Sequence, residues 1–397
     1  MGAAIFTLNK LLQEKMSRLA LVNAKFYGRK SDDSFLHIGV IVEGNRIVGV
    51  CNESEIPGGI QRVDMQGYNV APGFIDLLTN GAGGGSFGVT AEFADLKCMG
   101  ETMMQEGTTG FLAAAPSNTL PMYLKMQGAL QNHSSELPAN FIGMHLEGPF
   151  FSMEYRGAHR EDCVRDCSDD ELDALFGHPN HYVSMMSVSP ERITNKQVEY
   201  LEAKGIRVSF AHSAAGYEET LRFLDNPRHS VTHLYNGMPP MHHRRPGHIP
   251  AIFHAKPMTG IIVDGVHVSY EMVTMAYEFM PESLYLFTDR FTDCAAMNVS
   301  YDSAQDCYVR TAADGRKIIC GSALSMMKAV RNCVEHVGVS LEKAVQMASY
   351  YPAKVLGIDK DVGLLEPGYV ANLVAFDNNW QVLRVMINGE WEYKSKD

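Results

Sequence analysis

Eight short apolar runs, each of strand length, recur between residues 71 and 289 and are separated by longer segments of helical composition. Runs that are apolar throughout are typical of parallel strands covered on their outer face, and eight strand–helix units close naturally into a barrel. A doubly wound open sheet usually needs fewer strands. The sequence therefore predicts an α/β fold with a (β/α)8 TIM-like barrel. The runs are APGFIDLL (71–78), GTTGFLAAA (107–115), FIGMHLEG (141–148), YVSMMSVSP (182–190), RVSFAHS (207–213), SVTHLYN (230–236), TGIIVDG (259–265) and SLYLFTD (283–289).

Both ends of the chain follow a different pattern, in which apolar and polar residues alternate over short stretches. In the first stretch, Glu43-Gly44-Asn45 is typical of a hairpin turn. The last stretch alternates in the same way and turns at Pro367-Gly368 and Asn388-Gly389. We therefore expect the two ends to form one small β-sandwich domain. The predicted boundaries are 19–70 for its first part, 71–355 for the catalytic barrel and 356–397 for its second part.

The charge balance limits the possible partners. The chain carries 46 Asp and Glu against 34 Lys and Arg, a formal net charge of −12, and an acidic surface repels phosphate backbones and anionic membranes. No apolar stretch approaches the roughly 18 residues of a membrane span. Lys10, Glu14 and Lys15 interrupt what would be the apolar core of a secretory signal. We expect a soluble, cytoplasmic protein whose partner is a small molecule, neither nucleic acid nor membrane.

The eight cysteines are scattered along the chain, which indicates reduced thiols rather than a disulfide framework. Cys163 and Cys167 have the spacing of one helix face, and such a pair is either half of a metal site or an ordinary packed pair. Because no second Cys or His pair stands nearby in the sequence, the ordinary packed pair is favoured.

Gly83, Gly85 and Gly88 match the G-x-G-x-x-G pattern of a dinucleotide-binding turn. The surrounding run GAGGGSFG is so rich in glycine that a match is almost expected, and no clear helix opens at the last glycine. We interpret the run as a flexible barrel loop.

Polar side chains fall at the C-terminal ends of the predicted strands, where barrel enzymes have their active sites. Two imidazoles and a carboxylate, from His212, His233 and Glu147, form a ligand set that suits zinc and leaves one position for water. Each histidine taken alone is more often a structural residue than a ligand. Asp289 is either an N-cap or the acceptor of a proton from a metal-bound water. The joint placement favours a metal-dependent enzyme. The strand-end residues are Asp76, Glu147, His212, His233, Asp264 and Asp289.

Several longer stretches, in order over roughly residues 40 to 395, resemble the N-acetylglucosamine-6-phosphate deacetylases of the amidohydrolase superfamily. HLEGPF with a Gly-Ala-His shortly after it, followed by THLYN, is specific to that family. Residues 348–377 resemble the usual exit of the superfamily from its barrel into its β-domain. The other stretches are APGFIDLLTNGAGG (71–84), GMHLEGPFFSMEYRGAH (143–159), AHSAAGYEE (211–219), THLYNGMPPMHHRRPG (232–247), VDGVHV (263–268) and CGSALSMMKAVRN (320–332).

The resemblance implies metal-dependent hydrolysis of the acetamide of N-acetylglucosamine 6-phosphate, giving glucosamine 6-phosphate and acetate, by a homodimer. It implies one divalent metal ion on Glu147, His212 and His233, with zinc foremost and iron, manganese or cobalt as alternatives. Asp289 matches the acid and base, and His159 matches a residue that polarises the scissile carbonyl. The residues that match substrate-binding positions are Ala158, His159, Asn236, Gly237, Arg244, His267, Ile319, Cys320 and Gly321.

Some positions depart from the pattern. Leu78 and Asn80 stand where many superfamily members carry His-x-His, so we expect a single metal. Arg290 follows Asp289 where the family usually has a small residue, and a cation there could depress the pKa of the base. Arg245 stands where a glutamate is expected, and Arg244 either contacts the sugar phosphate, reaches a neighbouring subunit or is a solvated loop charge. These departures leave two alternatives: another acetylated amino-sugar phosphate as substrate, or a catalytically silent sugar-phosphate-binding relative.

Overall fold

The computed structural model describes residues 18–29, 37–178, 181–312 and 315–395. Residues 1–17, for which the resemblance supplies no counterpart, lie outside this part of the chain. Within the described part, no helix has both the length and the apolar character needed to cross a bilayer.

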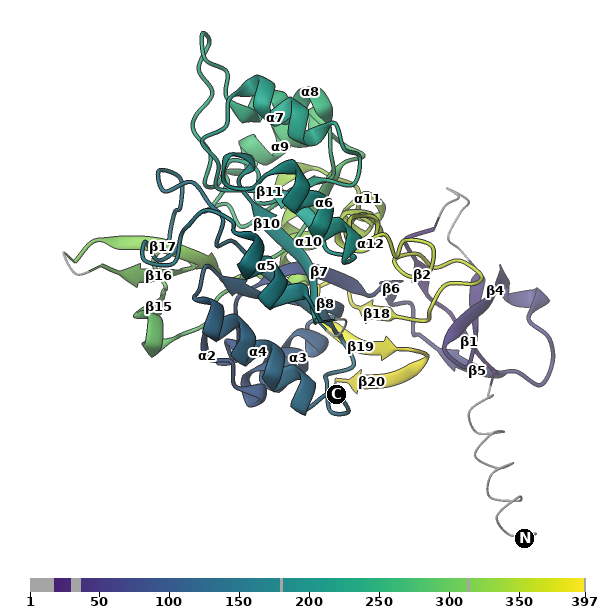
Figure 1. Ribbon diagram of the computed structural model, residues 1–397. Coiled ribbons are helices and arrows are strands. Elements are labelled where there is room, and N and C mark those ends of the chain that lie inside the picture. Colours follow the sequence, from purple (N-terminus) through teal and green to yellow (C-terminus); the bar gives the residue numbers. More distant parts are fainter. Residues whose placement is uncertain (1–17, 30–36, 179–180, 313–314, 396–397) are drawn as a thin grey trace.

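Eight parallel strands form the centre of the molecule (Figure 1) and follow one another around a single sheet in chain order. Each of the eight predicted runs coincides with one of them, to within one residue at the ends of β7 and β8, so the predicted barrel is confirmed. The strands are β7 (Phe74–Thr79), β8 (Thr108–Pro116), β9 (Phe141–Glu147), β10 (Val183–Val188), β11 (Arg207–Phe210), β12 (Ser230–Val231), β13 (Thr259–Ile261) and β14 (Leu284–Leu286). The first run also includes the end of another strand, β6 (Asn69–Pro72), which belongs to a different sheet.

The helices cover the outer face of this sheet and bury their apolar stripes against it. In α3 (Phe93–Gln105), for example, Leu96, Met99 and Met103 recur at helical spacing and are buried against β8 and its neighbours. The α6 helix (Asn195–Ala203) begins with a capping box formed by Thr194 and Gln197. The other barrel helices are α4 (Leu120–Asn132), α5 (Asp169–Phe176), α6 (Asn195–Ala203), α7 (Tyr217–Leu224), α8 (His248–Ala255), α9 (Tyr270–Phe279), α10 (Met326–Asn332), α11 (Leu341–Ala348) and α12 (Tyr350–Leu356).

The barrel is closed by the backbone that follows β14. Residues 79 and 290 form a parallel bridge. The amide of Asp289 donates to the carbonyl of Leu78 at 2.9 Å, and that of Asn80 donates to the carbonyl of Arg290 at 2.8 Å. A buried side chain strengthens the same seam, because Asp76 on β7 accepts hydrogen bonds from the Thr288 hydroxyl at 2.6 Å and the Thr288 amide at 3.1 Å.

Burial of Asp76 makes stability depend on pH in a defined direction. Burial raises the pKa of Asp76 to about 6, against the hydrogen bonds that lower it. The pKa in the unfolded chain is about 3.9. The contribution of Asp76 to stability is therefore complete below about pH 3.9 and is lost as the pH rises through about 6. Two pKa units correspond to about 3 kcal/mol.

Asp76→Asn removes this pH-dependent contribution. We expect the stability of the wild type relative to the variant to fall by about 3 kcal/mol between pH 4 and pH 7, as measured by urea unfolding at both pH values. The exposed Asp361→Asn is the matched control. A wild-type advantage that stays constant across this range would contradict the pKa assigned to Asp76.

The two ends of the chain meet in a small domain built from two packed sheets. One sheet has the order β4-β3-β1-β5 and the other the order β2-β6-β18-β19-β20. Side chains from both sheets share one core, which includes Val40 and Ile47 from the first sheet and Val70 and Leu373 from the second. The strands are β1 (Arg18–Val22), β2 (Lys25–Phe26), β3 (Ile38–Glu43), β4 (Arg46–Asn52), β5 (Gln61–Asp64), β18 (Leu373–Phe376), β19 (Val382–Ile387) and β20 (Glu390–Lys394).

One further sheet, which the sequence did not predict, extends from the barrel between β14 and α10 (Figure 1, left). It consists of β15 (Val299–Asp302), β16 (Cys307–Thr311) and β17 (Lys317–Ser322), all antiparallel. A short helix, η3 (Ala295–Met297), leads into it.

Two sequence interpretations need correction. Cys163 lies in a turn and Cys167 in irregular backbone, so the pair does not share a helix face, and both thiols are free. A short helix, α2 (Phe87–Thr90), does form around the last glycine of the glycine-rich run. Gly88 packs so closely that a Cβ would lie 1.8 Å from the carbonyl oxygen of Ala114, so this glycine is explained by close backbone approach.

Candidate metal centre and active site

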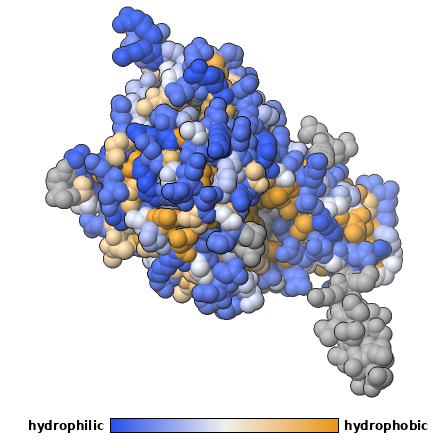
Figure 2. Space-filling view, viewed as in Figure 1, coloured by the Kyte–Doolittle hydropathy of each residue, from blue (hydrophilic) through white to orange (hydrophobic). Residues whose placement is uncertain are grey.

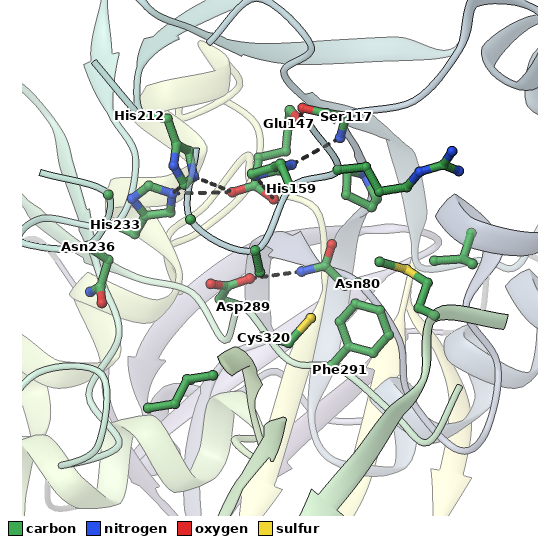
Figure 3. A pocket seen from close by; sticks show the side chains of 18 of the residues that line it. Asn80, Ser117, Glu147, His159, His212, His233, Asn236, Asp289, Phe291 and Cys320 are labelled. Carbon is green, nitrogen blue, oxygen red and sulfur yellow. Dashed lines mark hydrogen bonds and ion pairs between the residues drawn. The ribbon is translucent and has the colours of Figure 1, made fainter. Parts of the chain in front are cut away.

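A cavity of about 450 Å³ opens at the C-terminal ends of the barrel strands. The structure brings most of the predicted site residues to it (Figure 3). Two of them do not line the cavity. Gly321 comes one residue after Cys320, the last lining residue in the chain, and Arg244 is exposed on the loop that projects before α8 (Figure 1, top). The predicted residues that line it are Glu147, Ala158, His159, His212, His233, Asn236, Gly237, His267, Asp289, Ile319 and Cys320.

Glu147, His212 and His233 converge within the cavity. The Nε2 atoms of the two histidines lie 2.9 Å apart. Glu147 Oε1 lies 3.6 Å from Nε2 of His212 and 3.2 Å from Nε2 of His233. Donor atoms 2.0 to 2.2 Å from a tetrahedral metal lie about 3.3 to 3.6 Å from one another. One of the three distances lies in this range and the other two are shorter, by about 0.1 and about 0.4 Å. The three donors therefore converge on one point, as ligands of a single divalent metal do.

The three histidines close to Glu147 make its carboxyl group strongly acidic. Burial alone would raise its pKa, but the surrounding imidazoles of His159, His212 and His233 hold the pKa well below its ordinary value. The carboxylate is therefore ionised at neutral pH, as a metal ligand must be.

Backbone strain accompanies this convergence. His212, His233 and Asp289 have φ values of 47°, 34° and 46°, a region that residues with a Cβ rarely adopt. Such strained residues cluster at functional sites, where the surrounding structure holds them. Gly237 also has a positive φ, of 61°, and a Cβ there would lie 2.6 Å from Nδ1 of His212. Only glycine fits at this position.

Hydrogen bonds to the second ring nitrogens assign different states to two of the histidines. Nδ1 of His212 donates to the carbonyl of Tyr155 at 2.7 Å, which leaves the Nε2 lone pair free for a metal. Nδ1 of His159 instead accepts from the amide of Ser117 at 3.1 Å, so the proton of the neutral ring is on Nε2. Burial lowers the pKa of His159, which favours that neutral ring.

His159 is nevertheless near enough to be considered as a ligand, since donor atoms of Glu147, His159 and His212 all lie within 4.8 Å of one another. A protonated Nε2 has no lone pair to offer a metal. It is a hydrogen-bond donor, and it lies 3.8 Å from Oε2 of Glu147. The hydrogen bonding therefore favours Glu147, His212 and His233 as ligands and His159 as a donor toward a bound molecule.

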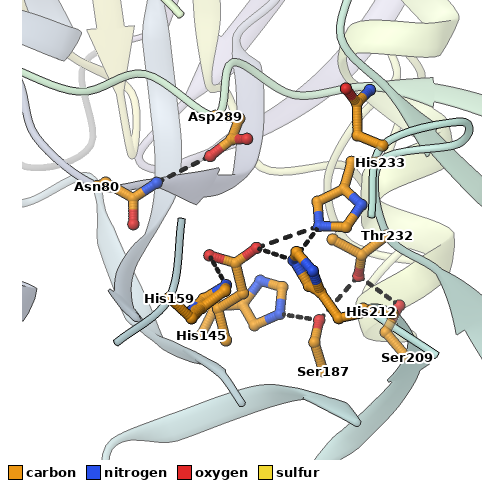
Figure 4. A network of polar contacts seen from close by, with 12 residues as sticks. Asn80, His145, His159, Ser187, Ser209, His212, Thr232, His233 and Asp289 are labelled. Carbon is orange, nitrogen blue, oxygen red and sulfur yellow. Dashed lines mark hydrogen bonds and ion pairs between the residues drawn. The ribbon is translucent and has the colours of Figure 1, made fainter. Parts of the chain in front are cut away.

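A chain of hydrogen bonds crosses the barrel beneath these residues (Figure 4). His145 Nδ1 donates to the carbonyl of Leu77 at 2.7 Å, and its Nε2 accepts from the Ser187 hydroxyl at 2.7 Å. Ser187 in turn accepts from Thr232 at 2.8 Å, and Thr232 accepts from Ser209 at 2.7 Å. Burial lowers the pKa of His145 to about 4, so the ring is neutral. This chain supports the backbone just before His233.

Asp289 lies across the cavity from the histidines and is half-buried (Figure 3). Its Oδ1 accepts a hydrogen bond from the side-chain amide of Asn80 at 2.8 Å. Burial, followed by the negative charges of Glu147, Asp76 and Asp264, raises its pKa well above the ordinary value. A carboxyl group of this kind is suited to taking up and returning a proton near neutral pH.

The expected influence of Arg290 on Asp289 is wrong. Although Arg290 follows Asp289 in the chain, it does not line the cavity. Its guanidinium donates to Glu106 at 2.5 Å. The charge of Arg290 is therefore neutralised by Glu106, and it does not lower the pKa of Asp289.

His267 is held by a neighbouring carboxylate. Its Nδ1 donates to Asp264 Oδ2 at 2.6 Å, and the other oxygen of Asp264 accepts the backbone amides of Val266 and His267 at 2.9 and 2.8 Å. The imidazole is thereby fixed at the cavity with Nε2 as its remaining polar atom.

Several lining residues were not predicted. Asn80 and Ser117 each follow a barrel strand directly, so the strand-end rule that found Glu147 would also have found them. Most of the apolar lining residues, by contrast, come from short or irregular segments without a sequence signal; the exceptions are Pro116 on β8 and Met122 on α4. The lining residues that the sequence analysis missed are Asn80, Val89, Pro116, Ser117, Asn118, Met122, Gly157, Arg160, Val266, Phe291, Ala296 and Met297.

Comparison with known families identifies the class. Residues 69–391 match the model of the amidohydrolase family, and residues 19–70 match that of the NagA composite domain. The chain belongs to the amidohydrolase family.

Within that family, the similar proteins are deacetylases of amino-sugar phosphates, as the resemblance implied. N-acetylglucosamine-6-phosphate deacetylase of Haemophilus influenzae is 32% identical over 94% of this chain and 99% of that protein. N-acetylgalactosamine-6-phosphate deacetylase of Escherichia coli O157:H7 is 32% identical over 81% and 87%. The crystal structure of N-acetylglucosamine-6-phosphate deacetylase from Pasteurella multocida superposes with a TM-score of 0.85 at 30% identity, covering 94% of this chain and 99% of that one.

Proposed function

We propose that this protein hydrolyses the acetamide of N-acetylglucosamine 6-phosphate to glucosamine 6-phosphate and acetate. The observation that carries the proposal is the convergence of Glu147, His212, His233 and Asp289 on one cavity at the catalytic end of the barrel. The similarity to curated deacetylases over nearly the whole chain supports the substrate class. The proposed location is the cytoplasm.

Glu147, His212 and His233 would hold one divalent metal ion, with zinc proposed first because two imidazoles and a carboxylate suit it. When bound, such an ion lowers the pKa of water and polarises an amide carbonyl. Asp289 takes the proton of the attacking water and then gives it to the departing amine. His159 donates its Nε2 hydrogen to the carbonyl oxygen as negative charge develops there.

The sugar phosphate would lie on the side of Asn236, Gly237 and His267. His267 can donate a hydrogen bond to phosphate from Nε2. Binding of this distant phosphate would position the acetamide at the reacting groups.

Arg244 is exposed on a projecting loop, and it does not line the cavity of its own chain. Figure 2 shows this loop, at the top, as hydrophilic. We propose that the protein is a homodimer and that Arg244 reaches the phosphate in the cavity of the partner subunit, because Arg forms strong charge-assisted bonds with phosphate.

The epimer of the sugar is a second question. Relatives named for N-acetylglucosamine 6-phosphate and for N-acetylgalactosamine 6-phosphate are both 32% identical to this chain. We therefore keep the second sugar as the alternative substrate. Arg290 no longer supports a change of substrate, since it pairs with Glu106 away from the cavity.

The test measures amine release from both epimeric phosphates and from unphosphorylated N-acetylglucosamine, with bound metal quantified in the same preparation. We expect turnover of the glucosamine derivative, loss of turnover on chelation and its recovery with a divalent ion. The unphosphorylated sugar should lose at least about 100-fold in kcat/KM, since two charged contacts are missing. Preference for the galactosamine derivative would establish the alternative. No turnover of either with one metal per chain would refute the proposal.

A further inference from the structure

One side of the cavity is apolar. Val89 on α2, Phe291 after β14, Met297 on η3 and Cys320 on β17 pack into one hydrophobic cluster, and all four line the cavity. We call these four residues the apolar wall. Burial raises the pKa of the Cys320 thiol to about 12, so this side chain is neutral and behaves as a small hydrophobe.

The opposite side of the cavity is polar. Figure 3 shows Asn236 and His233 on one side of Asp289, and Asn80 and Phe291 on the other. Asn236 lines this side with its side-chain amide, and His267 adds an imidazole to the cavity lining. The two sides of the reaction centre therefore offer different chemistry to a substrate that extends through it.

The scissile amide has two substituents that differ in the same way. Its nitrogen carries a polyhydroxyl sugar phosphate, and its carbonyl carbon carries an acyl chain. Once the carbonyl lies between Asp289 and His159, these substituents extend in opposite directions. The sugar belongs on the polar side, because its hydroxyl groups need hydrogen-bond partners and an unpaired buried hydroxyl is unfavourable. The acyl chain then faces the apolar wall.

We infer that the apolar wall forms a compartment for acyl chains longer than acetyl, so that the enzyme also hydrolyses N-propionyl and N-butyryl derivatives of its amino-sugar phosphate. This inference rests on the proposed function. The reaction is the same hydrolysis: water forms the new C–O bond, the amide C–N bond breaks, and the amine receives a proton as propionate or butyrate is released. The unbranched, flexible side chain of Met297 can adjust to different chain lengths.

The experiment compares N-acetyl-, N-propionyl- and N-butyrylglucosamine 6-phosphate with the metal-loaded enzyme. A closed, methyl-sized pocket would reject each added methylene by about 10- to 200-fold. We expect kcat/KM for the propionyl and butyryl compounds to stay within about tenfold of that for the acetyl compound, because apolar wall atoms replace water around each methylene.

Val89→Phe tests the position of the compartment by narrowing it, and Val48→Phe makes the same change at an exposed position of β4. Val89→Phe should lower the ratio of butyryl to acetyl kcat/KM at least about tenfold, and Val48→Phe should leave that ratio unchanged. Met297→Phe, on a different segment, should act in the same direction and serves if Val89→Phe does not fold, as judged by circular dichroism.

The possible failures are distinguishable. Turnover of the acetyl compound together with rejection of both longer compounds overturns the compartment and leaves the proposed function intact. Equal losses on all compounds in the two wall variants place the acyl chain elsewhere and overturn the assignment to the wall. No turnover of any compound by the metal-loaded wild type refutes the proposed function, and the inference that rests on it.

Discussion

Asp289→Asn is expected to lower kcat by about 10²- to 10⁴-fold, the range typical of a lost general acid and base, while the bound metal remains near one per chain. Asparagine has the shape of aspartate and can still accept the hydrogen bond from the Asn80 amide. It has no proton to exchange with the reacting groups. Single-turnover kinetics and metal analysis of the same preparation measure the two quantities.

The control for this variant is Asp293→Asn, an exposed carboxylate four residues further along the same segment. It should keep both activity and metal. Nearly full activity of Asp289→Asn would remove this residue from the reaction, and simultaneous loss of the metal would make it a ligand instead.

The second prediction separates the two possible ligand sets. His233→Gln is expected to lose at least about 100-fold in metal affinity, more than a change in a ligand's supporting partner usually causes, together with most of its activity. His159→Gln is expected to keep the metal and to lower kcat by about 10²- to 10³-fold, as removal of one donor to a developing oxyanion does.

Metal titration of the stripped variants, followed by activity assays, measures both effects. The pair is matched, since each change replaces one buried imidazole near Glu147. Metal loss in His159→Gln as complete as that in His233→Gln would overturn the protonation state assigned to His159 from its hydrogen bond with Ser117.

The barrel could be predicted from the sequence because buried parallel strands are apolar along their whole length, a pattern that survives even where β12 is only two residues long. The metal-site candidates could be predicted because polar residues are rare at such strand ends unless they have a function. Glu147, His212 and His233 stand out for that reason.

Other features depend on contacts between residues far apart in the chain. Arg290 finds its partner 184 residues away, at Glu106, so its position next to Asp289 in the sequence is misleading about its charge. The state of His159 depends on the Ser117 amide, 42 residues earlier. Most of the β15–β17 sheet and of the apolar wall lies outside the stretches that carry the family resemblance, and the packing of η3 and β17 against Phe291 brings these segments together.

The hydrogen bonds that close the barrel on either side of residue 289 also fix the carboxylate proposed as acid and base. The reactive group is thus part of the joint that completes the ring of strands. A partial opening at this joint would abolish catalytic activity while most of the molecule remained folded. Activity is therefore expected to report the integrity of this joint earlier than spectroscopic signals that average over all the helices.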